Sequence, residues 1–152
     1  MSLETVLVAV GEGDEDRIAP LARTAIDIAG PAGATVKLAH VFTKDSYDDL
    51  RRKLEFDKDA EVTPDVVAKR HVTIRELGDA LSDADVDFTW HGKIGDEDGK
   101  GKAIVELAEE LEADLVLVGG RKRSPTGKAV FGSTAQEVML NAPCPVTFVR
   151  AE

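Results

Sequence analysis

The chain has 152 residues, 43% hydrophobic and 32% charged, which fits one globular domain with a full hydrophobic core. Its 29 acidic and 19 basic residues give a net charge of −10, which disfavours general binding to nucleic acid or an anionic membrane. No apolar run reaches the ~18 residues of a membrane span. The single cysteine, Cys144, and an N-terminus without a secretion signal predict a cytoplasmic protein. The acidity suits a high-salt cytoplasm, and an ordinary protein of low pI fits the same composition.

Five short apolar segments rich in β-branched residues are predicted as strands. They cover residues 5–10, 35–41, 86–90, 114–119 and 146–149. Continuous apolar runs in the first and fourth segments are typical of central strands that are covered on both faces. The third segment alternates apolar and polar residues, a pattern that is typical of a half-exposed edge strand.

Helical spacing of apolar residues fills the stretches between the strands. One stripe comprises Ile18, Leu21, Ala22, Ala25 and Ala29, and Gly30-Pro31 is expected to end that helix. Thr63-Pro64 reads as an N-cap with proline in the first helical turn. The helix that it opens turns four residues inward: Val67, Ile74, Leu77 and Leu81. Another stripe comprises Ile104, Leu107, Ala108 and Leu111, and polar residues 44–60 predict a short surface helix or lid.

The alternation of strands with helices predicts a single α/β domain with an open parallel sheet and helices on both faces. Ligands of such sheets bind beyond the carboxyl ends of the strands, where the strand order reverses. Three segments should therefore meet at a ligand site. They are the loop at 11–16, the strand end at 40–41 and the loop after the fourth strand.

The loop after the fourth strand carries the strongest candidate for a binding site. It leaves the strand at Gly119-Gly120 and enters a helix at Gly132-Ser133-Thr134. Four cations lie between these points: Arg121, Lys122, Arg123 and Lys128. A helix N-terminus, a close backbone and positive charge together predict a phosphate cradle. The alternative is that the glycines only make turns and the cations are solvated. The loop is neither a Walker A motif nor a GxGxxG fingerprint.

At this point the chain resembles the universal stress protein family, in element order, in size and in the ending at residues 141–150. Nucleotide-binding members carry Gly-x2-Gly-x9-Gly-(Ser/Thr) after the fourth strand. Gly119, Gly132 and Ser133 match this motif, whereas Lys122 replaces the second glycine. Such members also carry an aspartate directly after the first strand, where this chain has Gly11. The resemblance extends over almost the whole chain and implies a single domain at 1–152. Within the family, the acidic composition is similar to that of haloarchaeal-type members. It implies a Rossmann-like five-stranded sheet of order 3-2-1-4-5.

The resemblance also implies a ligand, ATP or a related nucleotide, with Mg²⁺ as a companion of its phosphates. Ala9, Val10 and Gly11 would line the pocket beside the base and ribose, and the Val41 backbone would contact adenine. The phosphates would meet seven residues: Gly119, Gly120, Arg121, Lys122, Gly132, Ser133 and Thr134. Glu12 or Asp14 would take the ribose role of the missing aspartate.

These residues are compatible with three functions. The first is a nucleotide-binding stress-response regulator. The second is a dimeric interaction module of the family's non-ATP-binding branch. The third is a weak metal-dependent ATP hydrolase or nucleotidyl transferase, although no nucleophile–base pair or triad supports catalysis. The resemblance implies a homodimer that pairs the last strand through Val146, Phe148 and Val149. A strand edge covered by the chain's own tail is the alternative.

Other polar residues have mainly structural explanations. His40 and His91 lie near predicted strand ends, where a hydrogen-bonded histidine is expected more often than a site residue. Cys144 lies between two prolines and is expected to be a small buried residue rather than a nucleophile. The acids at 14–16 could hold a metal, and are more simply explained as favouring the start of the first helix.

Overall fold

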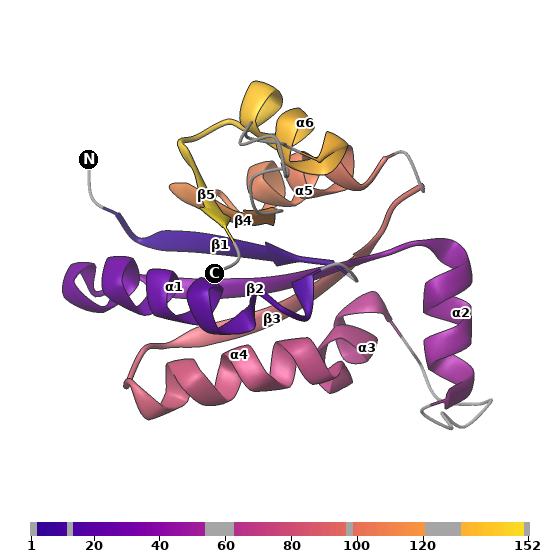
Figure 1. Cartoon of the computed structure of the whole chain (residues 1–152), viewed down its shortest axis with the longest axis horizontal. Coiled ribbons are helices and arrows are strands. Elements are labelled where there is room, and N and C mark those ends of the chain that lie inside the picture. Colours follow the sequence, from indigo (N-terminus) through magenta and orange to yellow (C-terminus); the bar gives the residue numbers. More distant parts are fainter. Residues whose placement is uncertain (1–2, 12–13, 54–62, 97–98, 121–131, 151–152) are drawn as a thin grey trace, which may run out of the picture.

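The computed structural model of the chain describes residues 3–11, 14–53, 63–96, 99–120 and 132–150. Five strands form one parallel sheet in the order β3-β2-β1-β4-β5, which confirms the predicted order (Figure 1). Their bounds are β1 Thr5–Val10, β2 Thr35–Phe42, β3 Phe88–Ile94, β4 Leu115–Gly120 and β5 Val146–Arg150. Because β1 pairs with both β2 and β4, the strand order reverses beside β1.

Helices cover both faces of the sheet, as predicted (Figure 1). Their bounds are α1 Ile18–Ala32, α2 Lys44–Lys53, α3 Pro64–Arg70, α4 Val72–Asp83, α5 Lys100–Glu110 and α6 Ser133–Asn141. On one face, α1 and α4 pack against Val6, Val8 and Leu38. On the other face, α5 and α6 pack against Leu7 and Ala9.

The first strand explains why the sheet has two hydrophobic cores. Successive side chains of a strand point to opposite faces, so the uninterrupted run at 6–10 supplies apolar groups to both. Val6, Leu7 and Val8 are completely buried, and Val10 is 2% exposed. The central position of β1 thus follows directly from its sequence, and it fixes the loop after Val10 at the carboxyl edge of the sheet.

Two helical predictions were wrong. The single helix expected from Thr63 onward is divided at His71, whose extended backbone (ψ 137°) ends α3 and caps α4. The His71 Nδ1 atom accepts a hydrogen bond from the Thr73 N–H at 3.2 Å, which stabilises the second start. The first helix continues beyond Gly30-Pro31 and ends at Gly33, whose φ of 67° suits a glycine C-cap.

The third strand begins and ends later than predicted, at Phe88 and Ile94 instead of 86 and 90. The Val86 N–H donates to the Leu81 carbonyl, so Val86 belongs to the turn that follows α4 and not to the strand. The strand continues because its pairing with β2 extends to Ile94 opposite Phe42. It is an edge strand, as predicted, and Trp90 is 37% exposed. None of the described helices has the length and apolar composition to cross a membrane.

Candidate functional site

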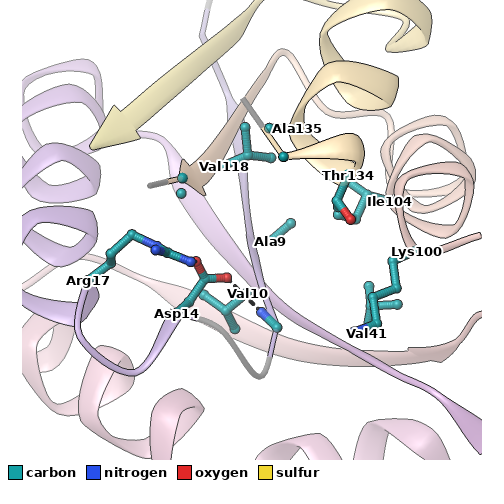
Figure 2. Close-up of a pocket in the computed structure, with 14 residues that line it drawn as sticks. Ala9, Val10, Asp14, Arg17, Val41, Lys100, Ile104, Val118, Thr134 and Ala135 are labelled. Atoms are coloured by element: carbon teal, nitrogen blue, oxygen red, sulfur yellow. Dashed lines mark hydrogen bonds and ion pairs between the residues drawn. The ribbon is translucent and has the colours of Figure 1, made fainter. Parts of the chain in front are cut away.

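A pocket of about 370 Å³ lies where the strand order reverses, at the carboxyl ends of β1 and β4 (Figure 2). This volume is within the range of about 300–1,000 Å³ that is typical of small-molecule sites. The residues that line it are Ala9, Val10, Gly11, Asp14, Arg17, Val41, Lys100, Ile104, Val118, Gly119, Gly120, Gly132, Thr134 and Ala135. The pocket therefore joins the ends of β1, β2 and β4 to the starts of α1, α5 and α6.

The structure brings together most of the residues predicted from the sequence. Eight of them line the pocket: Ala9, Val10, Gly11, Val41, Gly119, Gly120, Gly132 and Thr134. Ser133 is the first residue of α6, but its side chain lies outside the described part of the chain. Arg121 and Lys122 also lie outside the described residues.

The ion pair between Asp14 and Arg17 occupies one side of the pocket (Figure 2). The Asp14 Oδ1 atom accepts from Arg17 Nε and pairs with Arg17 Nη2, both at 2.7 Å. The other oxygen, Oδ2, accepts from the Gly11 N–H at 2.8 Å. The two side chains are only 12% and 11% exposed. These contacts hold the carboxylate in one orientation beside β1 and leave it acceptor capacity toward the pocket.

The glycines of the pocket differ in what a side chain at each position would contact. A Cβ atom at Gly119 would lie 2.7 Å from Asp14 Oδ1 and 3.0 Å from Arg17 Nε, so this glycine makes room for the ion pair. A Cβ atom at Gly120 would overlap the Phe148 ring of β5. At Gly132, no atom of the described residues lies within 4 Å of that position, so packing against them does not explain this glycine. A ligand contact remains open as the reason for Gly132.

Lys100 is the third charged residue of the pocket. It is the first residue of α5 and lies near Val41, across the pocket from Arg17 (Figure 2). Among the described residues it forms no ion pair, in contrast to Arg17. Neither Arg17 nor Lys100 was predicted from the sequence, because neither belongs to a recognisable motif and each lies at the start of a different helix.

His40 lies beside the site. It is the residue of β2 that pairs with Val10 of β1, and it is completely buried. Its ring stacks on Phe42 and tilts against His71, with centroid distances of 4.4 and 4.1 Å. Both ring nitrogens lack a hydrogen-bond partner in the described structure, which corrects the expectation of a hydrogen-bonded histidine. Burial lowers the pKa of His40 from 6.5 to about 3, helped by the charges of His71 and Lys100. The imidazole is therefore neutral at physiological pH.

The other candidate residues do not gather into a metal site in the described part of the chain. Within the described ranges, no three His, Cys, Asp or Glu residues gather as metal ligands. Of the acids at 14–16, Asp14 is bound to Arg17 and the other two are exposed. Burial, with the Asp114 charge, raises the pKa of the Cys144 thiol, which makes it a poor nucleophile.

Relatives of known sequence match parts of the chain. A universal stress protein of Methanocaldococcus jannaschii is 38% identical over 64 residues, covering 40% of this chain and 38% of the relative. A universal stress protein of Mycolicibacterium smegmatis is 31% identical over 70 residues, covering 46% of this chain and 52% of the relative. The matched part of the chain thus spans between a third and about half of these relatives.

Solved structures match the chain over its whole length. A universal stress protein in complex with cAMP has a TM-score of 0.67 at 21% identity. The match covers 100% of this chain and 100% of that one. A universal stress protein from Archaeoglobus fulgidus has a TM-score of 0.60 at 27% identity, covering 96% of this chain and 98% of that one. The family model described as "Universal stress protein family" matches residues 2–150. The chain therefore belongs to the universal stress protein family.

Proposed function

We propose that the chain is a cytoplasmic stress-response regulator that binds ATP or a related nucleotide in the pocket at the carboxyl ends of β1, β2 and β4. One observation carries this proposal: a pocket of about 370 Å³ lies where the strand order reverses. In this proposal, bound nucleotide alters the contacts that the regulator makes with its partners.

The chemistry of the lining supports a nucleotide ligand. Val10, Val41 and Ile104 offer an apolar wall for a base. Asp14 offers a carboxylate to sugar hydroxyls and would replace the aspartate that nucleotide-binding members carry directly after the first strand. Gly132 and Thr134, at the start of α6, lie where backbone N–H groups can meet phosphate. Mg²⁺ would enter with the phosphates of ATP.

Similar proteins favour adenine nucleotides among the possible ligands. The universal stress protein noted above was solved with cAMP, and one from Archaeoglobus fulgidus was solved with dAMP at a TM-score of 0.59 and 22% identity. Both ligands carry an adenine base and a single phosphate. We therefore include AMP-like ligands beside ATP in the proposal.

Calorimetric titration with ATP and AMP, with and without Mg²⁺, tests the proposal on protein freed of co-purified nucleotide. A micromolar dissociation constant, about −8 kcal/mol, is expected for at least one ligand. The variant Asp14→Ala should weaken binding, whereas Asp16→Ala, whose carboxylate is 76% exposed, should not. Absence of binding by folded protein, at low and at molar salt, would contradict the proposal.

A dimeric interaction module is the second candidate, and the Asp14–Arg17 ion pair favours it. This pair already satisfies the charged groups that lie nearest to Gly119, so the pocket has less need of an anionic ligand. The module would dimerise through β5, an edge strand that pairs only with β4 in the described sheet.

The dimer proposal needs one adjustment to its contacts. Val149 is 7% exposed within the chain's own core, and Phe148 packs against Gly120. These side chains and Val146 thus serve the fold, and a partner strand would pair with the backbone edge of β5. Sedimentation over a range of concentrations should report a dimer, with β5 amides gaining hydrogen-exchange protection as it forms. A monomer at all concentrations would exclude this interface.

A further inference from the structure

Among the described residues of the pocket, two are cations, and they differ in their availability to a ligand. Arg17 makes two 2.7 Å contacts with Asp14, and both side chains are close to 90% buried. A ligand phosphate that drew Arg17 away would leave the Asp14 carboxylate with only the Gly11 N–H. Because an unpaired buried charge is costly, this exchange is unfavourable. The pair is electrically neutral as it stands and attracts an anion only weakly.

Lys100 has no such partner in the part of the chain that the structure describes. No carboxylate of the described residues lies within ion-pair distance of it, although the chain carries 29 acidic residues. By comparison, Lys93, on the neighbouring β3, lies 3.1 and 2.8 Å from two glutamates of α5. An ammonium that lines a pocket without a counter-charge is available to an anionic group of a ligand.

Close packing of two helices fixes the backbone from which the Lys100 side chain extends. A Cβ atom at Gly101 would lie 3.0 Å from the Thr134 carbonyl and closer still to the Glu137 side chain, so α5 and α6 pack closely at this glycine. Lys100 precedes this contact and Thr134 takes part in it, and both line the pocket. Figure 2 shows the two residues on the same side of the pocket, opposite Asp14 and Arg17.

We infer that Lys100 is the residue that recognises the phosphate of the ligand, so that the pocket selects nucleotides over nucleosides. This inference rests on the proposed nucleotide binding. It divides the pocket into two chemically different ends. The Lys100 end binds a phosphate, and the Asp14–Arg17 end presents a neutral pair whose carboxylate accepts hydrogen bonds from hydroxyls.

Titrations with AMP and adenosine, which differ only in the phosphate, test the inference. Lys100→Gln should weaken AMP binding roughly tenfold, the value of a charge-assisted hydrogen bond, and leave adenosine affinity nearly unchanged. Lys100→Arg should restore most of the AMP affinity. The matched control is Lys102→Gln, which removes the same charge from an exposed position on the same helix and should alter neither affinity.

The outcomes separate this inference from the function on which it rests. If wild-type protein binds AMP and Lys100→Gln binds it equally well, the inference is overturned and the nucleotide site stands. An equal loss of AMP and adenosine in the folded variant would also overturn it, since that result indicates a structural role. If wild-type protein binds neither AMP nor ATP, the proposed function and the inference both fail. A selective loss of AMP, restored by arginine, supports the inference.

Discussion

Acid should destabilise this protein through His40, and the effect can be calculated. The folded state holds the pKa of His40 at about 3, because burial and the charges of His71 and Lys100 oppose protonation, whereas the unfolded value is 6.5. Between these two pKa values, His40 therefore binds a proton in the unfolded chain and not in the folded chain. Stability is complete above pH 6.5 and falls as the pH drops below it. At pH 5 the loss from this residue is about 2 kcal/mol.

The variant His40→Leu isolates this contribution. Denaturant unfolding followed by circular dichroism at pH 8 and at pH 5 gives the free energy of unfolding for both proteins. The pH-dependent loss should be about 2 kcal/mol smaller in the variant than in the wild type. At pH 8 the variant should be no less stable, because the native ring buries two nitrogens without hydrogen bonds.

An equal pH dependence in the two proteins would refute this reasoning. It would mean that His40 protonates readily in the folded state, and hence that water or a hydrogen-bond partner reaches its ring. A large loss of stability in His40→Leu at pH 8 would contradict the second part, since it would show that the imidazole makes a favourable buried contact.

Three further predictions concern packing and the ion pair. Gly120→Ala should lower the free energy of unfolding by about 1–3 kcal/mol, because its Cβ atom would overlap the Phe148 ring. By contrast, Gly30→Ala, inside α1 with nothing within 4 Å, should raise it by about 0.5–1 kcal/mol. Asp14→Asn should cost about 1–3 kcal/mol by weakening charge-assisted hydrogen bonds, whereas Asp16→Asn should cost almost nothing. Chemical denaturation measures all four, and equal effects within either pair would contradict the structural assignment.

The sequence predicted the sheet well because hydrophobic runs determine which strands are covered on both faces. The continuous apolar run of β1 identified a central strand, and its predicted bounds are those observed. The break at His71 escaped prediction because Val67, Ile74 and Leu77 keep a helical spacing on either side of it. Only the extended backbone of His71, stabilised by its own cap to Thr73, reveals two helices.

The candidate site was predictable where it depends on strand ends and less so where it depends on tertiary contacts. Gly119 and Val41 follow from their positions at the ends of parallel strands. Arg17 and Lys100 come from the starts of two helices far apart in the sequence, and no short motif joins them. The ion pair to Asp14 distinguishes Arg17 from Lys100, and it can be seen only in the folded chain.

Nuclear magnetic resonance mapping of the AMP-bound protein tests the central claim most directly, because it reports both binding and its location. The account predicts saturable shifts in the backbone amides of Gly11, Val41, Lys100, Gly119 and Thr134, which line one pocket. The amides of α2, which contributes no residue to that pocket, should move little. Shifts confined to residues outside the pocket, or no shifts with either AMP or ATP at millimolar concentration, would contradict the claim that this pocket is a nucleotide site.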